Sequence, residues 1–282
     1  MRINVVVVAG VAIASVLTAQ NALAGFWGTM PGCARSIAQG PDFDIWVVGC
    51  DDPGPGGAPI YRYDGGNEVF QQIPGPEGMS IGACPNVGGP CNSAVWMTDA
   101  QGLIYSYNRW SNTFSEIDYN YCNGAGPLRA KAVAYGQSYV ALGGVPWLID
   151  TYGNIIQIVA GCANVLNLPG GLNANLIATD INQRVMVRQD GSRSLWRLNP
   201  DGSFRWVASG YDTLNSGPSG GNPSTSGEMV AYLDNGPGHS FIEFWDSFIN
   251  VAYTGPPTSS RVVQVAKDVA ITEDGTIWQY FE

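Results

Sequence analysis

The chain has 282 residues, 13% of them charged, and its 23 acidic and 13 basic side chains give a formal net charge of −10. Because contacts to phosphates need clustered lysine and arginine, this balance excludes nucleic acids and anionic membrane surfaces as partners. Glycine (37 residues) and the aromatic residues (9 Trp, 13 Tyr and 9 Phe) are abundant, which is typical of a chain rich in strands and tight turns.

The first predicted element is a targeting segment at residues 1–24. Arg2 supplies a positive start, residues 5–17 are almost entirely apolar, and Ala22-Leu23-Ala24 has the small-x-small pattern of a cleavage site. We therefore expect cleavage after Ala24, a secreted or periplasmic protein, and one mature domain at residues 25–282. The apolar run is too short to predict membrane insertion, and no later stretch reaches the required length.

A repeated strand–turn–strand pattern occupies the rest of the chain. Its clearest copy is residues 94–107, A-V-W-M-T-D-A-Q-G-L-I-Y-S-Y, in which two β-branched and aromatic runs flank the turn Asp99-Ala100-Gln101-Gly102. Matched positions in the copies are 46, 96, 147, 186, 230 and 270, which are 50, 51, 39, 44 and 40 residues apart. This period is that of four-stranded propeller blades. We therefore predict an all-β fold, a six-bladed β-propeller with four strands in each blade.

The two ends of the mature chain are predicted to complete one blade together. Strands are expected at residues 262–267, 268–274 and 276–282, after which the chain ends one strand short of a blade. Residues 25–32 form an extra strand before the first blade. A closed ring leaves no long unpaired edge, so we expect residues 25–32 to join the last blade.

Six cysteines, an even number in a chain expected to be exported, predict three disulfides. The first pair follows from two antiparallel strands that meet at a turn near Asp42, the second closes a Pro/Gly loop, and the third crosses the third blade. The expected pairs are Cys33–Cys50, Cys84–Cys91 and Cys122–Cys162. No C-x-x-C motif occurs and His239 is the one histidine, so we expect no metal site and no cofactor.

The pattern Φ-P-G-x-A, followed by V-W-x-x-D-x-x-G-x-I-Y-x-Y, resembles the tectonin β-propeller repeat. The likeness is clearest over residues 27–117, with partial matches at residues 163–206 and 261–280. Tectonin-like proteins are six-bladed propellers, and several are lectins that recognise surface glycans between blades or at their rims. The resemblance therefore implies glycan binding.

Aromatic side chains are the predicted ligand-binding residues. Trp46, Trp96 and Trp147 share one register on the second strand of their repeats, and Tyr61 and Tyr105 lie on the adjacent strand. Because sugars stack on flat aromatic faces, equivalent clefts lined by these rings would bind a repetitive glycan surface through several weak sites. The alternative interpretation is that each ring packs between neighbouring blades.

We therefore expect an exported, monomeric, glycan-binding propeller without catalytic activity. One alternative is an exported propeller that binds another protein. Another is a glycoside hydrolase, which needs only two carboxylates about 5–10 Å apart. The candidate acids belong to repeated hairpin turns, however, whereas a catalytic pair would be expected once. These acids are Asp99, Asp150, Asp190 and Asp274.

Overall fold

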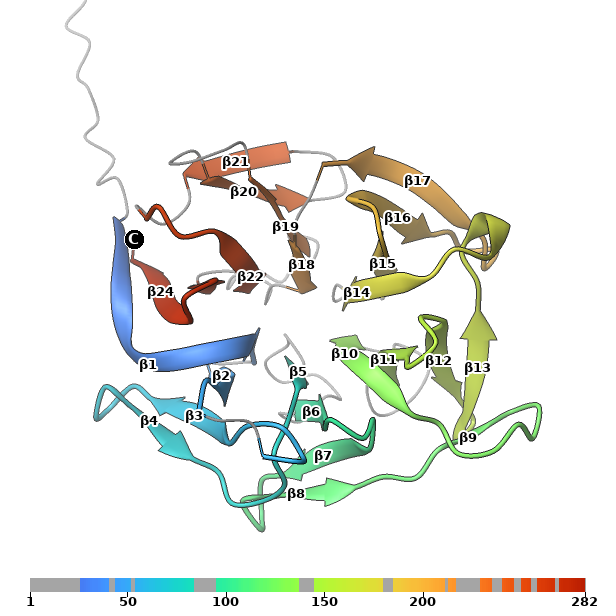
Figure 1. The fold of residues 1–282 in the computed structure, drawn as a ribbon, viewed down its shortest axis with the longest axis horizontal. Coiled ribbons are helices and arrows are strands. Elements are labelled where there is room, and N and C mark those ends of the chain that lie inside the picture. The colour runs from blue at the N-terminus through green and yellow to red at the C-terminus, as the bar shows by residue number, and fades with distance from the viewer. Residues whose placement is uncertain are drawn as a thin grey trace, which may run out of the picture.

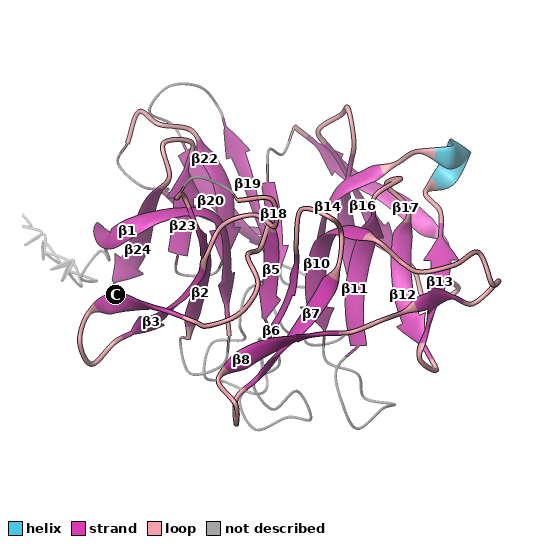
Figure 2. Ribbon diagram, turned by 60° about the horizontal axis from the view of Figure 1, so that its bottom comes forward, coloured by secondary structure: helices cyan, strands magenta, loops and turns pink. Residues whose placement is uncertain are grey.

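The structure is a computed structural model in which strands are arranged around a central axis (Figure 1). It describes residues 26–40, 44–51, 54–83, 95–136, 145–179, 185–210, 213–216, 229–234, 240–245, 250–254, 258–266 and 269–281. The expected targeting segment and the expected disulfide Cys84–Cys91 lie outside these residues. A 3-10 helix at Pro169–Gly171, cyan in Figure 2, interrupts the strands. Within the described part of the chain, no helix is long and apolar enough to cross a membrane.

Four sheets each contain an antiparallel meander of four strands, which we call a blade. The second blade comprises β5 (Ser80–Ala83), β6 (Val95–Thr98), β7 (Ile104–Asn108) and β8 (Thr113–Glu116). The third comprises β10 (Ala130–Gly136), β11 (Val145–Asp150), β12 (Ile155–Val159) and β13 (Cys162–Leu166), and β9 (Asn120–Tyr121) adds a parallel fifth strand to it. The fourth comprises β14 (Ala174–Thr179), β15 (Val185–Gln189), β16 (Ser194–Leu198) and β17 (Phe204–Ser209). The fifth comprises β18 (Thr213–Ser216), β19 (Met229–Asp234), β20 (Ser240–Trp245) and β21 (Asn250–Thr254).

The remaining sheet has seven strands and contains both ends of the described chain. Its order is β22 (Val262–Ala266), β23 (Val269–Thr272), β24 (Thr276–Phe281), β1 (Phe26–Gln39), β2 (Ile45–Gly49), β3 (Ile60–Asp64) and β4 (Val69–Gln72). The first half of β1 pairs antiparallel with β24 and its second half pairs antiparallel with β2. We call β22–β24 with the first half of β1 the last blade, and the second half of β1 with β2–β4 the first blade.

The expected pairing of the N-terminal strand with the last strand is therefore observed, from Phe26 opposite Phe281 onward. The sequence predicted two separate strands before Ile45, whereas the structure has one strand of 14 residues. Register shifts between Met30 and Cys33 and between Ala34 and Ser36 explain the difference. Bulges of this kind bend a strand without ending it, so β1 can pass from one blade to the next.

The innermost strands contact one another in a complete circle, in the order β1, β5, β10, β14, β18, β22 and again β1. Gln264 on β22 fixes the contact with β1. Its Oε1 accepts a hydrogen bond from the Ile37 N–H (3.0 Å) and its Nε2 donates to the Ile37 carbonyl (3.0 Å). Ser36 similarly accepts a hydrogen bond from the N–H of Ile81 on β5, at 3.3 Å. Side-chain-to-backbone hydrogen bonds thus join inner strands that are not paired in a sheet.

The repeated glycine of the hairpin turns joins each of three blades to the one that follows. Gly102, Gly153 and Gly275 have φ of +78°, +91° and +84°, a conformation that side chains with a Cβ rarely adopt. Their carbonyls accept hydrogen bonds of 2.9, 2.8 and 2.9 Å from the N–H groups of Ala130, Ala174 and Ala34, respectively. The turn glycine of one blade and an alanine at the start of the next are therefore two halves of one contact between blades, and Gly275 makes it between the last blade and the first.

Candidate functional site

The three predicted tryptophans lie between blades rather than on the surface. Trp46, Trp96 and Trp147 are 1%, 7% and 3% exposed. The ring centroid of Trp46 lies 4.7 Å from that of Tyr107 and 6.2 Å from that of Phe114, both on the second blade. Protein atoms therefore cover the faces of these rings, as the alternative interpretation of packing between blades requires. A stacking role for any of them would need the blades to separate.

The strand pairing changes which residue of the last repeat is equivalent to Trp46, Trp96 and Trp147. Trp96 lies opposite Ser106, four residues after the turn glycine, and Val269 lies opposite Gln279 in the same relation to Gly275. The residue equivalent to the tryptophans is therefore Val269, not the neighbouring position 270. The two turns have the same length, but the aspartate of T-E-D-G stands directly before the glycine, whereas that of D-A-Q-G stands three residues before it.

A tyrosine–aspartate pair recurs at the hairpin turns. Tyr105, 9% exposed, donates to Asp99 Oδ2 at 3.2 Å. Tyr61, the predicted residue on β3, is half-buried and donates to Asp51 Oδ2 at 2.8 Å. The pKa of the tyrosine is raised in both pairs. The hydrogen bond to Asp51 is the main cause for Tyr61. Burial is the main cause for Tyr105, whose pKa is raised to about 12. Both phenols are therefore neutral hydrogen-bond donors near neutral pH.

The third blade obtains its tyrosine from outside the repeat. Ile156 occupies the repeat position, and Tyr121 of β9 donates instead to Asp150 Oδ2 at 2.9 Å. Burial and this hydrogen bond raise the pKa of Tyr121. The predicted disulfide Cys122–Cys162 is present and ties the residue after Tyr121 to β13. Sequence reasoning missed Tyr121 because it lies in a segment that has no counterpart in the other repeats.

The turn aspartates are occupied by their own turns. Asp99 Oδ1 accepts the N–H groups of Gln101 (2.9 Å) and Leu103 (2.8 Å). Asp150 and Asp274 likewise accept backbone N–H groups two residues ahead, at 2.9 and 3.1 Å. This geometry is that of an Asx turn, which stabilises a hairpin. The structural role inferred from repetition is therefore supported for these three acids.

Asp51 differs from the other members of the tyrosine–aspartate pairs. The residues two and four positions after Asp51 are Pro53 and Pro55, which have no N–H to donate to its carboxylate. Among the residues that the structure describes, Tyr61 is the one hydrogen-bond donor to Asp51, and it uses Oδ2. Asp51 is exposed, so Oδ1 can accept hydrogen bonds from a ligand.

Asp51 and Tyr61 line a pocket of about 470 Å³ where β1 passes from the last blade to the first, which we call the seam pocket. A volume of this size lies within the range of small-molecule sites. Its lining residues are Pro31, Gly32, Cys33, Val47, Cys50, Asp51, Tyr61, Val69, Phe70 and Ile277. Asp51 is the one charged residue among them, and most of the others are apolar.

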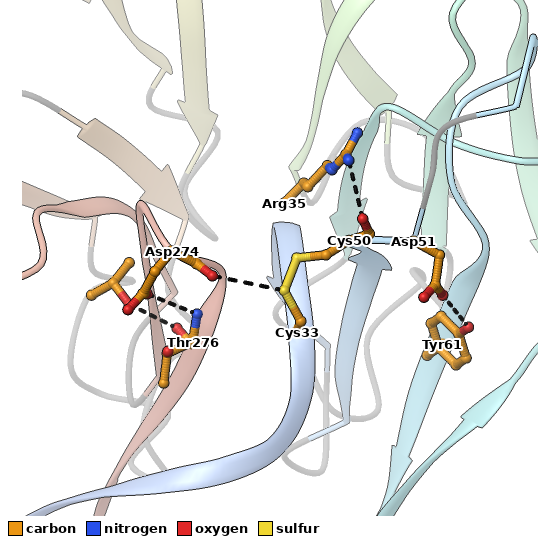
Figure 3. The surroundings of a disulfide bond; sticks show 8 residues. Cys33, Arg35, Cys50, Asp51, Tyr61, Asp274 and Thr276 are labelled. Carbon is orange, nitrogen blue, oxygen red and sulfur yellow. Dashed lines mark hydrogen bonds between the residues drawn. A yellow bond between two sulfur atoms is a disulfide. The ribbon is translucent and has the colours of Figure 1, made fainter.

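The predicted disulfide Cys33–Cys50 is present and forms one wall of the seam pocket (Figure 3). The Cys33 Sγ lies 4.0 Å from the Asp274 carbonyl oxygen, a contact rather than a hydrogen bond because a disulfide sulfur carries no hydrogen. A Cβ at Gly275 would lie 2.2 Å from the Cys33 Sγ and 2.6 Å from the Cys50 Sγ. The turn of the last blade therefore packs directly on this disulfide.

The seam pocket is open because the space is less filled here than at the contact between the first and second blades. Val47 faces Tyr61 in the register in which Met97 faces Tyr105, and Met97 is the larger side chain and fully buried. Ala58, which lies in the segment between Asp51 and β3 of the first blade, also covers the space next to Met97 and is 1% exposed. The last blade has only a tight turn at the corresponding place.

No family model matches the chain, and no curated protein matches its sequence. Solved structures do match in fold. A putative gluconolactonase has a TM-score of 0.57 at 10% identity, covering 91% of this chain and 92% of that one. Virginiamycin B lyase from Staphylococcus aureus has a TM-score of 0.51 at 13% identity, over 87% and 79%. BBS1N in complex with ARL6DN has a TM-score of 0.52 at 13% identity, over 84% and 74%. At such low identity these likenesses show the fold alone, and the chain is a β-propeller.

Proposed function

We propose that the chain is an exported, non-catalytic, six-bladed β-propeller of the tectonin type that binds carbohydrate in the seam pocket. The count of six follows when β1 is divided between the last and first blades, so that each has four strands. The circle of contacts between inner strands supports this division. Two disulfides in the described chain support export, since disulfides persist in oxidising compartments.

The observation that carries the proposal is the carboxylate of Asp51 in the seam pocket. Its Oδ2 is held by Tyr61, while Oδ1 can accept hydrogen bonds from sugar hydroxyl groups. The half-buried ring of Phe70 and the neighbouring apolar side chains offer the less polar surface on which sugar rings pack. The proposal therefore assigns ligand binding to Tyr61, one of the predicted residues, rather than to the tryptophans.

The same geometry supports binding rather than hydrolysis. Glycoside hydrolysis by carboxylates requires two of them about 5–10 Å apart. Among the residues that the structure describes, Asp51 is the one acid that lines the pocket, and Asp99, Asp150 and Asp274 are bonded to their own backbones. Known β-propellers include enzymes and binding proteins, so the fold itself does not decide between them.

A glycan array, followed by calorimetric titration of each bound glycan, tests the proposal. We expect Asp51→Asn and Tyr61→Phe to weaken binding by tenfold or more, because each breaks the carboxylate–phenol pair at the pocket. Tyr105→Phe is the matched control: it removes the same hydroxyl from the buried pair of the second blade and should leave binding unchanged. A folded protein that binds no glycan, or one whose binding survives Asp51→Asn, would refute the proposal.

Exposed aromatic side chains favour a second candidate function, the binding of a protein. Trp110, Tyr152 and Trp206 are 89%, 76% and 56% exposed, and none of them lines the seam pocket. Aromatic residues are enriched at protein interfaces. Under this alternative, Trp110→Ser and Trp206→Ser would abolish partner capture while Tyr61→Phe would not affect it.

A further inference from the structure

We infer that the ligand of the seam pocket carries a free amino group, so that the preferred ligand is a cationic amino sugar. This inference rests on the proposed function, since it takes the seam pocket to be a carbohydrate site. It concerns the chemistry next to Asp51 and does not depend on which sugar backbone carries the amine.

The charges around the seam pocket are the first argument. No lysine or arginine of the described chain lines it, and the one ion pair between described residues joins Arg62 to Asp44, at 2.8 Å. Arg35, the basic residue next to the disulfide, donates instead to the Cys50 carbonyl at 3.0 Å (Figure 3). Asp51 therefore forms no ion pair within the described chain. A ligand ammonium would supply the missing positive charge, whereas an acidic sugar would meet a like charge.

The hydrogen bonds of the Asp51–Tyr61 pair are the second argument. The hydroxyl of Tyr61 donates to Oδ2, and this bond raises the pKa of Tyr61 so that the phenol stays a donor. The proton of the pair thus stays on Tyr61, and Oδ1 of Asp51 can accept a hydrogen bond from a ligand. An ammonium group has three donors and no acceptor, and its hydrogen bond to a carboxylate is about twice as strong as a neutral one.

The walls of the seam pocket are the third argument. Tyr61 and Phe70 both line it, and the faces of aromatic rings attract cations. Val47, Val69 and Ile277 complete a largely apolar lining. A cationic amino group therefore matches this lining of aromatic rings and one carboxylate better than an uncharged acetamido group does.

Three tetrasaccharides with one β-1,4 backbone separate the possibilities, since they differ only at C2: glucosamine, N-acetylglucosamine and glucose. Calorimetric titration should show the free-amine form binding at least tenfold more tightly than the other two. Asp51→Asn should remove most of this preference. Asp118→Asn is the matched control, because it neutralises an exposed acid that does not line the seam pocket.

Each other outcome overturns the inference. Equal or tighter binding of the neutral forms would refute the amine preference while leaving carbohydrate binding intact. An equal loss of affinity in Asp51→Asn and Asp118→Asn would assign the preference to the acidic surface as a whole. Failure of all three sugars refutes the inference, and a negative glycan array would then refute the proposed function as well.

Discussion

Substitution of Gly275 by alanine tests whether the turn of the last blade is built against the disulfide of the first. Gly275 has φ of +84°, and a Cβ added there would lie 2.2 and 2.6 Å from the two sulfur atoms. Neither sulfur can move freely, since the bridge ties β1 to the residue that follows β2. Gly191 is a matched control, because it has φ of +68° and a Cβ there would meet nothing within 4 Å.

The two variants differ in the expected loss of stability. A residue with a Cβ in the left-handed conformation costs roughly 1–2 kcal/mol, which applies to both. Forcing an extra methyl group into a filled space costs about 1–3 kcal/mol more, which applies to Gly275→Ala alone. The free energy of unfolding should therefore fall by about 1–2 kcal/mol in Gly191→Ala and about 2–5 kcal/mol in Gly275→Ala.

Thermal unfolding of the two oxidised variants, followed by calorimetry, measures this difference. At about 2–4 °C per kcal/mol for a chain of this size, Gly275→Ala should melt about 2–12 °C below Gly191→Ala. Equal melting temperatures would show that the turn does not pack on the disulfide. The contact between the last and first blades would then need another explanation.

Four further predictions follow from the contacts described above. Deletion of residues 25–32 should lower the melting temperature sharply, because it removes the partner of β24; an unchanged melt would mean that the ends do not meet. Gln264→Ala should lower the free energy of unfolding by about 1–3 kcal/mol in denaturant unfolding, since it removes two hydrogen bonds to the backbone of Ile37, and a loss near zero would contradict this. Stability should fall as the pH rises from 10 towards 12, because folded Tyr105 keeps its proton while the unfolded tyrosine loses it; Tyr105→Phe should flatten that slope in pH-dependent unfolding. Replacing Cys122 and Cys162 together by serine should lower the free energy of unfolding by about 2–4 kcal/mol in denaturant unfolding. Peptide mapping of the intact chain should also recover Cys84–Cys91 as a pair.

The sequence alone was sufficient for the strands, for two disulfides and for the pairing of the chain ends. The strands depend on a local signal, namely alternation around the hairpin turns, whereas the pairing of the chain ends followed from a last blade that is one strand short. The continuity of β1 was not predictable, because Pro31 and Gly32 read as a break. In the structure they lie at a bulge where β1 changes partner.

The candidate site was harder to predict than the fold. Alternation shows which side chains share a face of a strand, but both faces of a blade are covered by neighbouring blades. The pattern could therefore not separate the buried Trp46 from the half-buried Tyr61. No sequence motif predicts the seam pocket. It lies where Val47 and a tight turn meet, between the last and first blades. Met97 and Ala58 fill the equivalent space between the first and second blades.

The division of β1 between two blades also sets an order of events for a chain made from its N-terminus. Phe26 is among the first residues of the fold to leave the ribosome, yet its partner Phe281 is among the last. Until β24 has been synthesised, the edge of β1 that it will pair with stays unpaired, and unpaired edges expose a growing chain to aggregation. Native pairing over such a separation is intrinsically slow. The pairing of β1 with β24 must therefore wait until every blade between them has been synthesised, and substitutions that weaken either strand act on that step.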